Sequence, residues 1–321
     1  MNLRQNQRFP RSTGLRIALT GATGFVGRRL QRQLIAAGHQ LRALIRPASA
    51  ANARLAPGCQ AIIVELTDSE RLAAALDDID VLVYCAGSVR GAGIDDFRLA
   101  NVTGVRNLAT VAAARTRPVP FLLISSLAAS RPQVSDYALS KFEGEQALAQ
   151  FSALPWTVIR PPALYGPGDR EMRPVLNWIR RGLAPMPGPR GQRLSLLHVD
   201  DLAGAVQAWL SCIERCRHQV YAIDDGTPGG YDWNTIGRAV AGREPWLLPV
   251  PAALLHTAAR INQLLSLAVG YAPMLTPGKV RELRQPDWLG DNGEFGRATG
   301  WSPQIDLATG SARLFADPDG H

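Results

Sequence analysis

Residues 15–27 read Leu15-Arg-Ile-Ala-Leu-Thr-Gly-Ala-Thr-Gly-Phe-Val-Gly27, and this stretch decides the fold. An apolar run ends at Thr20, three glycines follow at intervals of three, and a helical pattern continues over residues 28–37. Glycine suits such a turn because its backbone accepts positive φ and because a pyrophosphate can approach it without meeting a Cβ. The amides and the positive dipole at the start of a helix favour negative charge. The stretch therefore predicts a strand, a tight turn and a helix start that together hold a dinucleotide.

The rest of the chain alternates strand-like runs with helical patterns, which is typical of a parallel sheet with right-handed crossovers. The expected strands are residues 16–20, 40–45, 60–64, 81–85, 121–125 and 157–160. After about Gly166 frequent prolines interrupt this order, and we expect a smaller lobe there. We therefore predict an α/β fold, a doubly wound parallel sheet of the Rossmann type with a C-terminal substrate-binding lobe. The predicted division is a disordered arm (1–14), a dinucleotide-binding domain (15–165 plus about 194–225) and the lobe (166–193 and 226–321).

Composition narrows the possible partners. The chain has 321 residues, 46% of them apolar, and a net charge of +8 from 35 basic and 27 acidic residues. Its arginines are scattered, which favours a small anionic ligand such as a dinucleotide over nucleic acid. The four cysteines do not form a disulfide framework, and nothing resembles a cleavable signal peptide, so we expect a cytoplasmic protein. Cys212, Cys216 and His218 lack a fourth ligand at suitable spacing, and we expect no metal site.

Tyr137 and Lys141 form a candidate pair for proton transfer. They are four residues apart in a helical pattern over residues 136–151, so their side chains share one face. A phenol titrates near pH ~10, and a nearby cation favours the phenolate. Only Lys141 and Lys279 are lysines among the 35 basic residues, which suggests that a compact ammonium is required at position 141. We predict that Lys141 lowers the pKa of Tyr137, which then acts as an acid or base.

With the glycine turn, this pair resembles the short-chain dehydrogenase/reductase superfamily, in its extended, epimerase/dehydratase-like branch. The resemblance covers roughly residues 15–310. Further matches lie in the expected order at residues 80–87, 101–107, 123–126, 160–168 and 197–202. The resemblance implies an enzyme that uses NAD or NADP to move a hydride to or from a small-molecule substrate.

The resemblance also implies a set of site residues. Ser126 orients the reacting oxygen, with Ser125 as the competing candidate, while Lys141 also holds the nicotinamide ribose. Asn101 matches an asparagine that supports the lysine through a water, although a helix-capping role is equally open. The implied catalytic residues are Ser126, Tyr137, Lys141 and Asn101. The implied cofactor contacts are Gly21, Thr23, Gly24, Phe25, Val26, Gly27, Arg46, Glu65, Leu66, Cys85, Ala86, Gly87, Tyr137, Lys141 and Pro161.

Arg46 bears on the choice between the two cofactors. It follows the second expected strand, where an NAD enzyme of this fold more often carries an acid that binds the ribose hydroxyls. A guanidinium there suits a 2′-phosphate, so we expect NADP rather than NAD; the alternative is a surface arginine. Glu65 stands where the resemblance expects an aspartate beside the adenine, and its longer side chain leaves that contact open.

Two stretches of the sequence bear on the substrate. Residues 166–169 (Gly-Pro-Gly-Asp) and the apolar stretch 246–269 are similar to 3β-hydroxysteroid dehydrogenase and dihydroflavonol reductase relatives. We therefore expect an oxidoreductase acting on an apolar or lipid-like ketone or secondary alcohol. One alternative is a nucleotide-sugar epimerase or dehydratase, with phosphates bound by Arg170, Arg173, Arg180, Arg181 and Arg193. The other is a non-catalytic NADP-binding sensor or assembly subunit, a class that commonly lacks the tyrosine or the lysine.

Residues 251–270 are apolar but contain His256, Arg260, Asn262 and Gln263, so we expect no transmembrane span. A helix that covers an apolar substrate and one that lies on a bilayer surface both remain open. The resemblance also implies a homodimer that pairs through helices near residues 101–114 and 137–151.

Overall fold

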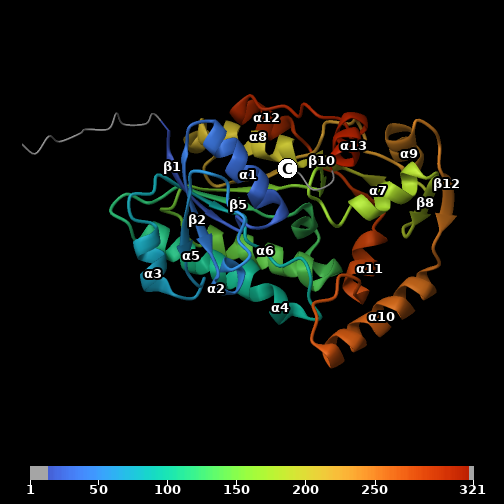
Figure 1. Cartoon of the computed structure of the whole chain (residues 1–321), viewed down its shortest axis with the longest axis horizontal. Helices are drawn as coiled ribbons and strands as arrows, with labels where there is room; N and C mark the ends of the chain where they lie inside the picture. The colour runs from blue at the N-terminus through green and yellow to red at the C-terminus, as the bar shows by residue number, and fades with distance from the viewer. Residues whose placement is uncertain (1–13, 318–321) are drawn as a thin grey trace, which may run out of the picture.

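A sheet of seven parallel strands forms the centre of the molecule (Figure 1). The computed structural model describes residues 14–317, so the arm expected at the N-terminus lies almost wholly outside the described residues. The strand order is β11-β6-β5-β4-β1-β2-β3, and the predicted doubly wound α/β fold is confirmed. The strands are β1 (Arg16–Thr20), β2 (Gln40–Ile45), β3 (Cys59–Ile63), β4 (Val81–Tyr84), β5 (Phe121–Ile124), β6 (Trp156–Arg160) and β11 (Gln219–Ala222).

Helices cover both faces of this sheet (Figure 1). Because side chains alternate along a strand, Ile17 and Leu19 of β1 pack in one core and Ala18 packs in the other. The first core includes residues of α1 (Phe25–Ala36), α8 (Val199–Leu210) and α12 (Gly293–Thr299). The second includes residues of α3 (Ser69–Ala75), α5 (Gly104–Ala113) and α6 (Asp136–Ala149). Burial on both faces explains why the strands read as continuous apolar runs.

The order of the sheet reverses between β1 and β4, and the glycine turn lies at that point. Gly21 has φ +66°, and a Cβ placed on it would lie 2.6 Å from the carbonyl oxygen of Cys85. Thr20 Oγ1 accepts hydrogen bonds from the amides of Cys85 (3.1 Å) and Ala86 (3.0 Å). The turn after β1 and the loop after β4 are therefore held together at the edge where ligands bind in open α/β sheets.

The expected lobe is built around its own apolar cluster, which includes Leu176, Ile179 and Ile236. Its elements are α7 (Arg173–Arg180), β8 (Leu183–Met186), α9 (Trp233–Ala241) and β12 (Trp246–Pro249), with β8 and β12 paired in parallel. After β12 the chain runs through α10 (Ala252–Val269) and α11 (Pro277–Leu283). Phe295 and Trp301, which the predicted division places in the lobe, pack instead in the core that contains β1.

The remaining elements are short or connect these two parts. They are α2 (Pro47–Ala50), α4 (Ile94–Arg98), β7 (Ala163–Tyr165), β9 (Arg193–Leu194), β10 (Leu196–His198), β13 (Asp287–Trp288) and α13 (Leu307–Ala316). A π-helical segment, η1 (Leu99–Thr103), joins α4 to α5, and short 3₁₀ helices are η2 (Leu127–Ser130), η3 (Pro132–Val134) and η4 (Ile213–Cys216). Two of them, η2 and η3, lead from the end of β5 into α6.

Candidate functional site

Tyr137 lies in the first turn of α6, next to the side chains of Ser126 and Phe97. Ser135 caps the helix, since its Oγ accepts a hydrogen bond from the amide of Ala138 at 3.0 Å. The Phe97 ring meets the Tyr137 ring edge-on, with 6.0 Å between centroids. We expected a lowered pKa for Tyr137, but burial raises it to about 12, Ser126 lowers it by hydrogen bonding, and the charge of Glu282 raises it. Desolvation is the largest of these effects and Lys141 is not among the groups that shift this pKa, so the predicted lowering by Lys141 is wrong.

Lys141, one helical turn later, is buried at the carboxyl end of β5. Its Nζ donates a hydrogen bond to the carbonyl oxygen of Ile124 at 3.1 Å. Burial lowers the pKa of Lys141, whereas Cys85 and Glu145 raise it. A Cβ placed on Gly87 would lie 3.3 Å from this Nζ. The loop of residues 85–87 therefore lies against the glycine turn at one end and against Lys141 at the other.

Asn101 holds that same loop to α6. Its Oδ1 accepts from the amide of Ser88 (3.1 Å), and its Nδ2 donates to the carbonyl oxygen of Ser88 (3.1 Å) and to Ser140 Oγ (2.9 Å). It lies inside the π-helical segment η1 and caps no helix of the described chain, so the capping alternative is wrong. A Cβ on Gly144 would come within 2.0 Å of the Asn101 carbonyl oxygen, so α6 packs tightly against η1. Such π-helical insertions are frequent at functional sites.

The two candidate serines have different partners. Ser125 Oγ donates to the carboxylate of Glu145, which also pairs with Arg160 through an Nε–Oε1 contact of 3.0 Å. Ser126 Oγ accepts from the amide of Ala128 at 3.2 Å, and its side chain interacts with Tyr137. The structure thus brings Ser126 to the phenol and engages Ser125 in a buried ion-pair network. Glu145 was not predicted, although its position four residues after Lys141 on the same helix is a sequence signal that could have identified it.

The glycine turn packs closely against the start of α1. A Cβ on Gly27 would lie 2.1 Å from the Gly21 carbonyl oxygen, which holds the start of α1 close to the turn. Gly24 is the N-cap of α1 and offers no side-chain cap to the amides of the first turn. Those amides and the helix dipole suit a pyrophosphate. Thr23, Phe25 and Val26 are partly exposed at this helix start. These residues fit the dinucleotide that the sequence predicts.

The remaining predicted cofactor contacts follow the carboxyl ends of β2, β3, β4 and β6. Arg46 and Glu65 are exposed there. Leu66 is buried, and its carbonyl oxygen accepts from Asn107 Nδ2 at 2.8 Å. Pro161 is buried, and its carbonyl oxygen accepts from the amide of Leu127 at 2.8 Å. Burial raises the pKa of Cys85 to about 11, which keeps its thiol protonated at neutral pH.

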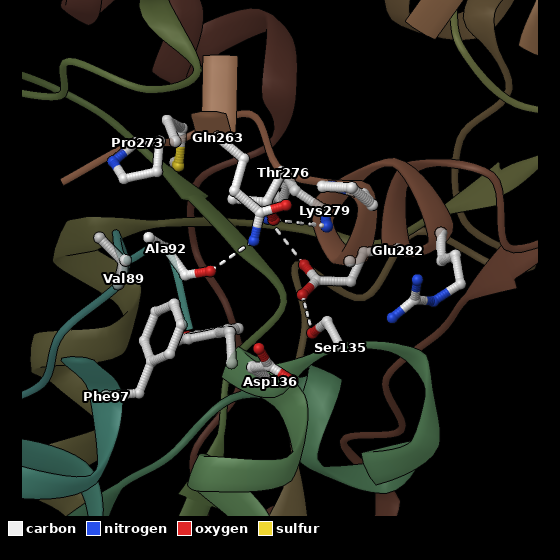
Figure 2. A pocket seen from close by; sticks show the side chains of 16 residues that line it. Val89, Ala92, Phe97, Ser135, Asp136, Gln263, Pro273, Thr276, Lys279 and Glu282 are labelled. Atoms are coloured by element: carbon white, nitrogen blue, oxygen red, sulfur yellow. Dashed lines mark hydrogen bonds and ion pairs between the residues drawn. The ribbon is translucent and has the colours of Figure 1, made fainter. Parts of the chain in front are cut away.

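A cavity of about 140 Å³ opens beside Tyr137, and residues that no sequence motif identifies form one wall of it (Figure 2). Lys279 Nζ lies 5.9 Å from the centroid of the Tyr137 ring and 2.8 Å from Glu282 Oε2. Ser135 Oγ donates to the other oxygen of the same carboxylate. Gln263 of α10 donates to the carbonyl oxygen of Ala92 across the cavity. Lys279 was notable in the sequence only for its rarity, and no local pattern links it to Tyr137.

Comparison with known proteins agrees with this geometry. Residues 17–223 match the model of the NAD dependent epimerase/dehydratase family. A ceramide reductase of Caulobacter vibrioides is 32% identical over 90% of this chain and 93% of that protein. A 2-alkyl-3-oxoalkanoate reductase of Stenotrophomonas maltophilia is 25% identical over 94% of this chain and 99% of that protein. A UDP-glucose 4-epimerase of Vibrio cholerae is 26% identical over 77% of this chain and 80% of that protein.

Solved structures share the fold. A putative epimerase from Burkholderia cenocepacia has a TM-score of 0.72 at 20% identity, covering 96% of this chain and 99% of that one. The Bordetella bronchiseptica enzyme WbmG, solved in complex with NAD, has a TM-score of 0.68 at 18% identity, covering 97% and 96%. At these identities the likeness supports the architecture alone.

The substitution Glu282→Gln tests what sets the acidity of Tyr137. Glu282 raises the pKa of Tyr137, so removing its negative charge stabilises the phenolate and moves the pKa below about 12. The measurement is an alkaline titration followed by phenolate absorbance. The signal of Tyr137 is the part of that absorbance that is lost when Tyr137→Phe is introduced into the same protein. Glu143→Gln, on a carboxylate of α6 that pairs with Arg98 at 2.8 Å, is the control and leaves the midpoint unchanged. A midpoint for Glu282→Gln at or above that of the unmodified protein contradicts this electrostatic account.

Proposed function

Since the chain belongs to the NAD dependent epimerase/dehydratase family, we propose that it reduces the ketone of an apolar, long-chain substrate and that NADP is its cofactor. That it is an NAD(P)-dependent oxidoreductase on this scaffold follows from the family and from its reductase relatives. The substrate class, NADP specificity and the roles of individual residues are our proposals. The observation that carries them is that Ser126 lies beside Tyr137, while Lys141, one turn later on the same helix, lies against the loop that contacts the glycine turn.

In the proposed mechanism, Tyr137 gives its proton to the substrate carbonyl oxygen. The bound nicotinamide cofactor supplies the hydride. Because the pKa of Tyr137 is raised to about 12, the phenol keeps its proton at neutral pH and can donate it to a carbonyl oxygen. Ser126 orients the reacting oxygen by hydrogen bonding, and Lys141 stabilises the phenolate that forms once the proton has left. The buried carboxylate of Glu145 favours the charged form of Lys141.

An apolar substrate is supported by the relatives and by the cavity. The names of two relatives specify a ceramide and an alkyl-substituted oxoalkanoate, both of which carry long hydrocarbon chains. The cavity beside Tyr137 is lined in part by Val89, Phe97, Pro273 and Met274, which suit an alkyl chain near the reacting carbonyl.

Nucleotide-sugar epimerisation is the second candidate, and it has support of its own. The UDP-glucose 4-epimerase relative aligns with most of this chain, and the same tyrosine and lysine would serve that chemistry. The reductases align over more of the chain, so we favour ketone reduction. A purely non-catalytic role fits less well because the tyrosine, the lysine and the nearby serine are all retained. The homodimer through α5 and α6, and the cytoplasmic location, stay predictions.

The substitution Tyr137→Phe tests the proposed activity. Loss of the proton donor lowers kcat/KM for ketone reduction by about 10²–10⁴-fold. Turnover is followed as NADPH oxidation with a panel of long-chain ketones, and cofactor binding is measured separately by fluorescence. Tyr221→Phe is the control, because Tyr221 lies in β11 with its ring packed on Phe295. This variant is expected to keep the activity of the unmodified protein. Unchanged turnover in Tyr137→Phe contradicts the proton role, while epimerisation of UDP-sugars without ketone reduction favours the second candidate.

Cofactor choice is tested at Arg46. If this exposed guanidinium binds the 2′-phosphate, Arg46→Ala raises KM for NADPH by about tenfold or more and leaves KM for NADH nearly unchanged. The matched control is Arg71→Ala, because Arg71 is an exposed arginine of α3 that lies after β3 rather than at the end of β2. Binding of the 2′-phosphate by Arg46 is ruled out if the unmodified protein prefers NADH. It is also ruled out if Arg46→Ala leaves KM for NADPH unchanged.

A further inference from the structure

Helix α10 presents apolar side chains outward, away from the rest of the molecule. Figure 1 shows it at the periphery, distant from the central sheet. Leu264 and Leu267 are 67% and 69% exposed, and Val269 is 75% exposed. The outward apolar positions are Leu254, Ile261, Leu264, Leu265, Leu267 and Val269. Leu254, Ile261 and Leu265 are spaced seven and then four residues apart, so they lie on one face and form a continuous stripe along the helix.

The opposite face of α10 carries polar groups that bind the protein. Asn262 Nδ2 donates to the carbonyl oxygen of Leu275 at 2.9 Å, and Gln263 donates to that of Ala92. Ser266 on the same face is buried, and its Oγ bonds within the helix to the Gln263 carbonyl oxygen. A surface helix of a globular protein normally buries its apolar face and exposes its polar one. The amphipathic pattern of α10 is inverted, and its inward hydrogen bonds hold the apolar stripe outward.

The chain around α10 has a charge that suits an anionic surface. No aspartate or glutamate lies between Glu244 and Glu282; of the three basic residues there, Lys279 pairs with Glu282 and Arg281 donates to the Val134 carbonyl oxygen, which leaves Arg260. Arg260 is exposed on α10 itself. Two exposed aromatic residues, Trp246 (72%) and Tyr271 (43%), lie just before and just after the helix. Apolar side chains with nearby cations and aromatic residues are what an interfacial helix presents to anionic lipid headgroups.

We propose that α10 docks the protein on the surface of an anionic lipid bilayer, with its apolar stripe inserted among the acyl chains. No helix of the described residues is long and apolar enough to cross a membrane. Because one face of α10 bonds the protein and the other is apolar, the helix, which is about 27 Å long, lies in the plane of the interface. A second copy is a poorer occupant, because one helix face of about 300 Å² falls well short of the roughly 800 Å² per partner of a stable interface.

This docking connects with the cavity beside Tyr137. Gln263 on the inward face of α10 lines that cavity, as do Pro273, Met274 and Thr276 in the segment that follows (Figure 2). A lipid substrate held in the bilayer would then reach the cavity beside the docked helix without crossing water. This route to Tyr137 rests on the proposed function, whereas the docking itself rests only on α10 and its surroundings.

Vesicle flotation of the full chain tests the docking. We expect the protein to float with phosphatidylcholine vesicles that contain phosphatidylglycerol and to float less with phosphatidylcholine alone or at high salt. Ile261→Asp combined with Leu265→Asp lowers the bound fraction by about tenfold or more, because two inserted apolar side chains are lost. Ile63→Asp is the matched control, since Ile63 in β3 and Ile261 are each 53% exposed, and it floats like the parent protein.

Further measurements separate the outcomes. Thermal melting and cofactor binding establish that the double variant is folded, and sedimentation reports the oligomeric state of each protein without lipid. The proposal is overturned if the parent protein does not float or if the double variant floats equally well. It is also overturned if the parent protein is an oligomer that the same two substitutions dissociate, because that result assigns the stripe to a second copy. Tyr137→Phe floats normally whether or not ketone reduction is the activity, so a failure of the proposed function is distinguishable.

Discussion

The close approach of the turn after β1 to the loop after β4 is the constraint on which the site depends. There is no space for a side chain at position 21, because a Cβ there would lie 2.6 Å from the Cys85 carbonyl oxygen. The same loop reaches Lys141 at Gly87, two residues further along. One short segment thus sets the distance between the proposed pyrophosphate site and the proposed site of proton transfer. A bulkier residue at Gly21 would separate these two places as well as obstruct the phosphate site.

The protein also sets the protonation state of its candidate acid. Shielding from water and the nearby carboxylate of Glu282 favour the neutral phenol of Tyr137, while Ser126 favours the phenolate. Burial likewise disfavours the charged form of Lys141, which Glu145 partly restores. Low polarity around the pair strengthens the interaction between phenolate and ammonium once the proton has moved. The resting state therefore keeps the proton on the phenol, as the proposed role of Tyr137 as a proton donor requires.

The sequence predicted the fold well because its signals are local. The expected strands agree with the observed ones to within a residue at each end, and β1, the turn and α1 follow directly from the apolar run and the glycine spacing. The pairing of Tyr137 with Lys141 was likewise readable from helical periodicity. Lys279 and Glu282 were not found, because they reach Tyr137 only through the tertiary path of α10 and α11. The net direction of the Tyr137 pKa shift was missed for the same reason: desolvation depends on packing that no local pattern records.

The central proposal is that one bound cofactor reaches from the glycine turn to Tyr137, Ser126 and Lys141. A crystal structure with NADP bound tests it most directly. The account predicts that the pyrophosphate lies on the amides at the start of α1 and that the nicotinamide ring lies beside the loop of residues 85–87, within reach of the Tyr137 hydroxyl. A nucleotide bound elsewhere, or a Tyr137 hydroxyl directed away from the nicotinamide, would contradict it.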